Sequence, residues 1–294
     1  MIQKLPRLGL VCSTNDGLLS TNRTIRLASL DKEKVIEIAT KNIKDLPKII
    51  EFCNANNITM FRLGNSMIPF ASHQNFDTTI WKDLQPLFEE VKRLSLGHTL
   101  RLTIHPGQFI QLGSKNPNVV VSSLRELRYC CELLDALEAG ESGVITLHLG
   151  GTHGNKHETM DRFCEVFKKN QWLSRYLALE NDEYNFTAAE TLEVANHCGI
   201  GMIFDIFHHS INPSNITWKE IKASWKDKRP KVHISSQGDG QVGKHGDFIT
   251  LEDFKNLQNF LGDDFFDVDI MVEAKKKEDA IKRIFDNKNS IDGL

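Results

Sequence analysis

Short apolar runs alternate along the chain with longer segments whose apolar residues recur at helical spacing. The segment 35–54 is of the second kind, because Ile43, Leu46 and Ile50 fall on one face of a helix. The pattern predicts strands at 7–12, 60–64, 100–105, 144–149, 176–182, 201–207, 232–236 and 267–273. It predicts helices at 35–54, 82–96, 116–139, 157–170, 187–197, 217–225 and 251–260, with a last helix that ends near residue 285.

Eight strand–helix units in 294 residues predict a single (β/α)₈ TIM barrel that spans residues 1–294. The strands are almost continuously apolar, as expected for parallel strands that are buried on both faces. An open, doubly wound sheet is the alternative fold. However, no glycine-rich phosphate-binding fingerprint follows the first strand, and polar residues stand at the ends of most strands rather than at one switch point.

Composition excludes few functions. The net charge of −3 argues weakly against a nucleic-acid partner, although bound divalent cations would reverse the local field. No apolar run approaches the roughly 20 residues that span a bilayer, and the first residues show no signal peptide. No two of the cysteines form a CxxC pair, so we interpret them as buried thiols. We expect a cytoplasmic protein, associated with the nucleoid in a prokaryote.

Metal-ligating residue types stand at the ends of six consecutive predicted strands. If their side chains face the barrel axis, they converge on one cavity at the carboxyl-terminal mouth. Closely packed carboxylates repel one another unless cations lie between them, and histidine nitrogens with carboxylate oxygens suit Zn²⁺, Mn²⁺ or iron. The six residues are His105, His148, Glu180, Asp205, His233 and Glu273.

Three further candidate ligands, His73, His208 and His245, are expected on loops at the same mouth. Nine ligand-type side chains exceed the needs of one ion, so we infer two or three ions. Such a cluster can bind a phosphate, activate water and stabilise a leaving oxygen. A single histidine at a strand end is more often a hydrogen-bonded core residue. The recurrence of ligand types at one level of six strands argues against that interpretation for the set. His209 is a doubtful ligand beside His208.

Other polar and aromatic residues are expected near this mouth. Lys231 points the same way as His233, so it either pairs with a carboxylate or is carbamylated. Gln108 and Phe109 follow the third strand and could enter a stack of nucleic-acid bases. Phe109 could equally fold back onto the rim. The run 275–277 of lysines is either a solvated helix start or a phosphate contact.

Ordered motifs on every strand resemble the UV damage endonuclease family over nearly the whole chain. The motifs are Arg7-Leu8-Gly9-Leu10, Phe61-Arg62-Leu63-Gly64-Asn65-Ser66, Thr103-Ile104-His105-Pro106-Gly107-Gln108, Leu147-His148-Leu149-Gly150-Gly151, Leu179-Glu180-Asn181-Asp182, Phe204-Asp205-Ile206-Phe207-His208-His209, Lys231-Val232-His233-Ile234-Ser235-Ser236 and Met271-Val272-Glu273-Ala274-Lys275.

The resemblance implies a TIM barrel related to endonuclease IV that nicks double-stranded DNA immediately 5′ to cyclobutane pyrimidine dimers, 6-4 photoproducts and abasic sites. It implies a three-metal cluster, commonly with manganese, held by the nine candidate ligands, and a modified Lys231. Gln108 and Phe109 would probe the lesion. The family often has Tyr where this chain has Phe109, and an aromatic residue near Leu10.

We therefore expect a metal-dependent DNA repair endonuclease with Mn²⁺, or alternatively Zn²⁺. It should need no nucleotide cofactor, bind no membrane and act as a monomer. The expected catalytic residues are Glu180, Asp205, Glu273, His233 and Lys231, and the expected DNA contacts are Gln108, Phe109, Asn15 and Lys275. A metal-dependent sugar isomerase or epimerase on the same barrel is the main alternative. A metal-binding or lesion-binding protein without catalysis is the third.

Overall fold

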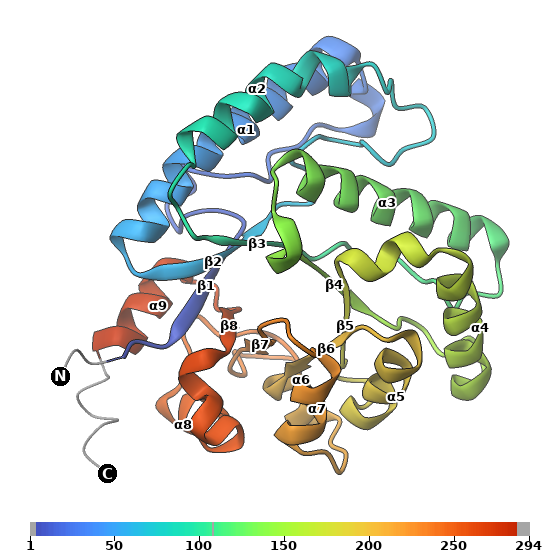
Figure 1. The fold of residues 1–294 in the computed structure, drawn as a ribbon, viewed down its shortest axis with the longest axis vertical. Helices are drawn as coiled ribbons and strands as arrows, with labels where there is room; N and C mark the ends of the chain where they lie inside the picture. Colours follow the sequence, from blue (N-terminus) through green and yellow to red (C-terminus); the bar gives the residue numbers. More distant parts are fainter. Residues whose placement is uncertain (1–3, 108, 287–294) are drawn as a thin grey trace.

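Eight parallel strands close into a barrel in the order of the sequence in the computed structural model, which describes residues 4–107 and 109–286 (Figure 1). The closure pairs the first strand with the last, so the predicted TIM barrel is confirmed. The expectation of a single domain over residues 1–294 extends beyond the described residues and stays a prediction. The strands are β1 (Arg7–Val11), β2 (Ile58–Leu63), β3 (Arg101–Ile104), β4 (Val144–His148), β5 (Leu177–Glu180), β6 (Gly201–Asp205), β7 (Lys231–Ile234) and β8 (Asp269–Val272).

Helices surround this barrel, and their apolar faces pack against the strands (Figure 1). The two longest of the described helices begin where a capping side chain accepts hydrogen bonds from free amide groups. The α-helices are α1 (Lys32–Ala55), α2 (Ile80–Leu94), α3 (Pro117–Ala136), α4 (Lys156–Lys169), α5 (Ala188–Cys198), α6 (Ile206–Ile211), α7 (Trp218–Ser224), α8 (Leu251–Leu261) and α9 (Lys277–Asp286). Short 3-10 helices are η1 (Leu27–Ser29), η2 (Gly140–Ser142), η3 (Gln171–Arg175) and η4 (Gly262–Asp267). None of the described helices is both long and apolar enough to cross a membrane.

The pairing register puts the strand ends at a common level. His148 pairs with Glu180 across β4 and β5, and Asp205 pairs with His233 across β6 and β7. Residues directly opposite each other on neighbouring strands lie close together, so the register alone brings these ligand types together at the carboxyl ends. At the other end of the barrel, the buried carboxylate of Asp269 accepts hydrogen bonds from Arg7 (2.7 Å) and Arg101 (2.8 Å).

The predicted sixth strand, 201–207, is wrong at its carboxyl end. β6 stops at Asp205, and α6 begins at Ile206. Asp205 ends the strand because its carboxylate accepts a hydrogen bond from the backbone amide of His208 (2.9 Å) and so caps the new helix. His208 and His209 therefore lie on a helix and not on a loop.

Candidate metal centre

Three groups of ligand-type side chains meet at the carboxyl-terminal mouth of the barrel. In each group, one nitrogen or oxygen from every member lies within 4.8 Å of the others. Glu180, at the end of β5, belongs to all three groups and is 1% exposed. The groups are His105–His148–Glu180, Glu180–His233–Glu273 and Glu180–Asp205–His208. They contain all six residues that the sequence placed at strand ends, together with His208.

The two carboxylate oxygens of Glu180 face different imidazoles. Its Oε1 lies 2.5 Å from His233 Nδ1. Its Oε2 lies 3.0 Å from His105 Nε2 and 3.3 Å from His148 Nε2. Although these distances are short, the buried Oε2 atom has no hydrogen bond within the described residues. Ligand atoms around a shared cation lie close together without donating hydrogen bonds to one another. The contacts of Glu180 Oε2 have this character.

Backbone carbonyls orient two of the imidazoles. His105 Nδ1 lies 3.1 Å from the carbonyl oxygen of Pro106, and His208 Nδ1 lies 3.0 Å from that of Asn181. A carbonyl only accepts, so each Nδ1 carries a proton, and each Nε2 is the nitrogen left to face the cavity. Metal-ligating histidines are typically held by a second hydrogen bond of this kind.

Burial and neighbouring charges shift the pKa values of the candidate ligands in different directions. Burial raises the pKa values of the Glu180 and Asp205 carboxyl groups. Burial alone would lower the pKa of His208, but the carboxylates of Asp205, Glu180 and Glu183 together raise it to about 10. By contrast, burial and the nearby Arg62 guanidinium lower the pKa of His105 to about 3. The imidazole of His105 is thus neutral, as a metal ligand must be.

The donor set fits divalent cations. Buried polar atoms with no hydrogen-bond partner among the described residues cluster here: Glu180 Oε2, Asp205 Oδ2 and His148 Nδ1. An unpartnered buried carboxylate oxygen is costly, and a cation removes that cost. Imidazole nitrogens with carboxylate oxygens are ligands of Zn²⁺, Mn²⁺ and iron.

Arg62, on β2, is a charged member of the site that the sequence analysis missed. Its guanidinium donates a hydrogen bond to Glu273 Oε1 and lies 3.3 Å from His233 Nε2. Although burial opposes ionisation of Glu273, Arg62 holds the pKa of that carboxyl group well below its usual range. An arginine inside a predicted strand gives no signal of its own, because sequence does not show which strand residues face the barrel interior.

Lys231 lies below the ligands, fully buried inside the barrel. Its Nζ donates a hydrogen bond of 2.7 Å to Thr146 Oγ1 on β4. Burial and the nearby Arg62 charge hold the pKa of Lys231 well below its usual value. The side chain therefore points inward, in line with the strand alternation from His233. No carboxylate lies within ion-pair distance of Nζ among the described residues.

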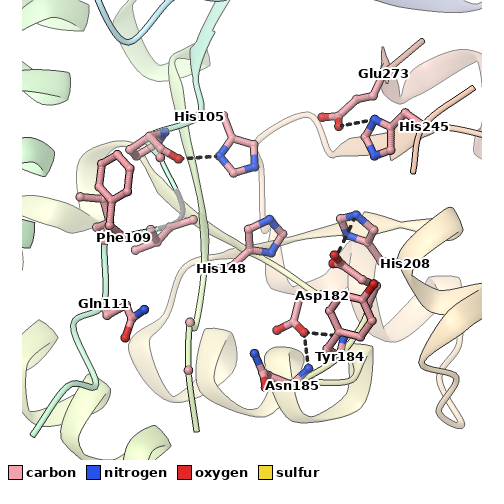
Figure 2. Close-up of a pocket in the computed structure, with 17 residues that line it drawn as sticks. His105, Phe109, Gln111, His148, Asp182, Tyr184, Asn185, His208, His245 and Glu273 are labelled. Carbon is pink, nitrogen blue, oxygen red and sulfur yellow. Dashed lines mark hydrogen bonds and ion pairs between the residues drawn. The ribbon is translucent and has the colours of Figure 1, made fainter. Parts of the chain in front are cut away.

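A cavity of about 680 Å³ opens from the ligands to solvent. His105, His148, His208 and Glu273 line its inner part (Figure 2). Phe109, which is 72% exposed, stands at its rim. The Phe109 ring packs over Gly107, where a Cβ atom would come within 2.6 Å of Phe109 Cζ. Glycine at this position thus lets the exposed ring lie against its own loop.

Of the two remaining candidate ligands, His245 lies near the clustered residues and His73 is not among them. His245 Nδ1 lies 3.7 Å from Glu273 Oε2 at the cavity wall (Figure 2). His73 is not among the clustered ligands; its ring contacts Phe70, and its Nδ1 accepts a hydrogen bond from Asn75 N (3.3 Å). Its role as a ligand stays a prediction.

Besides Phe109, two of the expected DNA contacts are exposed, and the fourth lies outside the described residues. The Asn15 side chain donates to Asp279 Oδ2 (2.8 Å), which joins its loop to α9. Lys275 is exposed, and its backbone amide binds the carbonyl of Gly246 beside His245 (3.0 Å). Gln108 is the residue outside the described ranges. Leu10 is completely buried, so it offers no stacking surface.

Comparison with known proteins settles the family. A family model described as UV-endonuclease UvdE matches residues 6–294. The chain belongs to the UvdE family. The UV DNA damage endonuclease of Bacillus cereus (strain G9842) is 30% identical over 271 residues, which cover 90% of this chain and 86% of that protein. That of Clostridium perfringens (strain 13 / Type A) is 32% identical over 289 residues and is covered to 70%, with 95% of this chain.

Solved structures agree with this assignment. The crystal structure of SacUVDE superposes with a TM-score of 0.88 at 32% identity and covers 99% of this chain and 100% of that one. Endonuclease IV from Thermus thermophilus (TM-score 0.59, 15% identity, 96% of this chain and 98% of that one) is similar in fold alone. So is D-psicose 3-epimerase from Clostridium cellulolyticum H10 (TM-score 0.52, 15% identity, 78% of each chain).

The UvdE assignment confirms the main functional prediction. The chain is an enzyme of the UV damage endonuclease family, and the family acts on damaged DNA. The fold shared with an epimerase gives no support to the sugar isomerase alternative, because one barrel hosts many unrelated activities.

Proposed function

We propose that this chain nicks double-stranded DNA immediately 5′ to cyclobutane pyrimidine dimers, 6-4 photoproducts and abasic sites, with two or three divalent ions at the mouth of the barrel. The sharing of Glu180 by three ligand groups is the observation that carries the proposal. One carboxylate that faces several imidazoles and a second carboxylate suits a multinuclear centre better than a single ion. We propose Mn²⁺ as the resident metal, with Zn²⁺ as the alternative.

The proposed ligands are the strand-end residues with three additions from the mouth: His73, His105, His148, Glu180, Asp205, His208, His233, His245 and Glu273. Bound ions would polarise the phosphodiester and lower the pKa of water at the site. His73 is the least supported ligand, since it lies apart from the three groups. We also propose that the protein acts as a monomer and needs no nucleotide cofactor.

Side chains of this protein position the reaction. Glu180, Asp205, Glu273 and His233 group at the buried end of the cavity, where a phosphate would bind only if cations balanced the carboxylates. Arg62 fixes Glu273 by a hydrogen bond to Oε1. Lys231 lies below the proposed ligands and connects β7 with β4 through its hydrogen bond to Thr146. Its buried amine is also our candidate for carbamylation, which mass spectrometry of the native protein at neutral pH would detect as added mass.

The rim would select damaged DNA. Phe109 offers an exposed ring beside the cavity, and we propose that it enters the stack with Gln108 once the lesion bases leave it. Damaged bases stack poorly and cost less to extrude, which supplies selectivity. Lys275 and Asn15 would contact the DNA backbone, and the enzyme would work in the cytoplasm on the cell's own DNA.

Nicking of supercoiled plasmid tests the proposal. We expect relaxation of UV-irradiated plasmid with Mn²⁺, little action on untreated plasmid, and none in EDTA. End-labelled duplexes with one defined lesion would then locate the nick. Equal cleavage of irradiated and untreated plasmid would contradict lesion recognition, and cleavage in EDTA would contradict the metal centre.

A further inference from the structure

Tyr184 is an exposed aromatic residue at the cavity that has no role in the proposed reaction. It lies on the loop between β5 and α5, it is 60% exposed, and it lines the same cavity as Phe109. The chain has three tyrosines, and the other two, Tyr129 and Tyr176, are 3% and 2% exposed. Tyr184 is therefore the single tyrosine of this protein that a ligand in the cavity can reach.

The loop that carries Tyr184 is held in one conformation. The carboxylate of Asp182 accepts hydrogen bonds from the backbone amides of Tyr184 (2.9 Å), Asn185 and Phe186 (3.0 Å). The amide of Asp182 in turn binds the carbonyl of Phe186 (3.1 Å). A side chain presented by such a loop loses little conformational freedom when a ligand arrives.

The far end of the ring is held as well. Tyr184 Oη donates a hydrogen bond to the carbonyl of Val242 (3.1 Å), on the loop after β7. The next residue, Gly243, has a φ of +89°, and a Cβ atom there would approach Tyr184 Oη to 3.0 Å. Glycine thus leaves room for this contact. The ring is fixed at both ends while its face stays open to solvent.

Two exposed aromatic rings therefore border one cavity. Phe109 and Tyr184 stand on opposite sides of it, with His148 between them in the view of Figure 2. The charges around Tyr184 indicate what it can bind. Asp182 and Glu183 precede it and line the same wall, so a phosphate would be repelled there. The face of a nucleobase is neutral and would not be repelled.

We infer that Tyr184 is a stacking surface for a base of the damaged strand, opposite Phe109, and so helps to select lesions that retain both bases. This inference rests on the proposed function, because it takes damaged DNA as the ligand. A pyrimidine dimer presents two bases that the cavity wall can stack, whereas an abasic site lacks one. Tyr184 therefore contributes more to the dimer than to the abasic site.

Variants at Tyr184 test this inference on two duplexes of one sequence, one with a thymine cyclobutane dimer and one with an abasic site. Tyr184→Leu removes the aromatic face, and Tyr184→Phe keeps the face but removes the bond to Val242. Stacking of one base corresponds to roughly 5- to 150-fold in affinity. We expect Tyr184→Leu to weaken dimer binding and raise KM at least about fivefold, with a smaller effect on the abasic duplex. Tyr184→Phe should stay close to the wild type.

Three results would overturn the inference. Equal losses of affinity on both duplexes would mean that Tyr184 does not distinguish a dimer from an abasic site. A loss with Tyr184→Phe as large as with Tyr184→Leu would mean that it only joins two loops. An unchanged Tyr184→Leu would mean that it plays no part. If the wild type neither binds nor nicks either duplex, the proposed function fails, and the inference fails with it.

Nitration of the wild-type protein gives a readout that requires no substitution. Tetranitromethane should modify Tyr184 in preference to the two buried tyrosines, and peptide mass spectrometry would follow it. We expect the dimer duplex to slow nitration of Tyr184 more than an undamaged duplex of the same length. Equal protection by both duplexes would contradict contact with the lesion.

Discussion

Glu180 contributes an oxygen to all three ligand groups, so one substitution there alters every proposed metal position at once. The strand-end ligands could be found from the sequence because residue type and strand period act together: alternate residues share a face, and parallel strands end at one level. Arg62 and Tyr184 could not be found in this way. The first depends on which face of β2 points inward, and the second on the fold of a loop held by Asp182.

Glu180→Gln keeps the size of the side chain and removes its charge. We expect metal content to fall and nicking to drop at least about 100-fold, since even the partners of metal ligands contribute about 10- to 100-fold. Elemental analysis and plasmid nicking would measure the two effects. Glu165→Gln, on an exposed face of α4, is the matched control and should change neither. Full metal content in Glu180→Gln would show that Glu180 is not a metal ligand.

Arg62→Met removes a buried cation and leaves Glu273 without its arginine partner. Breaking a buried ion pair on one side costs about 3–5 kcal/mol. We expect a loss of this order in the free energy of unfolding in EDTA, and a smaller loss in Mn²⁺, because a metal ion can neutralise the carboxylate. Urea unfolding under both conditions would measure the difference. The same loss in both would show that metal does not compensate for Arg62.

At the scale of elements, α6 is a helix that the hydrophobic pattern of the sequence did not predict. Ile206 and Phe207 continue the apolar run of β6, and a short apolar run does not distinguish a strand from the first turn of a helix. The capping role of Asp205 decides the boundary. By contrast, Thr187 and Glu190 form a capping box at the start of α5, and a signal of this kind can be recognised in the sequence because it is local.

Asp205→Asn separates the two roles of this residue. Asparagine caps a helix about as well as aspartate, so we expect the protein to keep its thermal stability in EDTA. It lacks the carboxylate charge, so metal content and nicking should fall. Asp205→Ala should lose the cap too and cost about 1 kcal/mol more. If Asp205→Asn kept its full metal content, the carboxylate would not be a ligand.

At the scale of the whole molecule, the barrel was predictable because eight alternations of strand and helix leave few ways to bury continuous apolar strands. The net charge of −3 argued weakly against a nucleic-acid partner, yet the chain belongs to a DNA-cleaving family. Net charge does not report where the charges lie, and cations bound at the mouth, as proposed, would reverse the field at the site of contact.

Metal binding should stabilise the whole barrel. A ligand at 100 times its Kd stabilises the folded state by about 2.7 kcal/mol, and 1 kcal/mol shifts Tm by about 2–4 °C in larger domains. We therefore expect Mn²⁺ to raise Tm by at least about 5 °C over EDTA in differential scanning fluorimetry. Mg²⁺, which favours oxygen ligands, should raise it less. Equal Tm values in EDTA and Mn²⁺ would contradict a structural coupling of metal and fold.

The closure of the barrel between β1 and β8 has a consequence for biosynthesis. The last proposed ligand, Glu273, follows β8, and β8 completes the ring by pairing with β1 near the start of the chain. A ribosome therefore has to synthesise all eight strands of the barrel before the proposed ligand set is complete. Chains that lack β8 would hold the earlier histidines without the final carboxylate, so the proposed metal centre can form only once β8 has been synthesised and the ring closes.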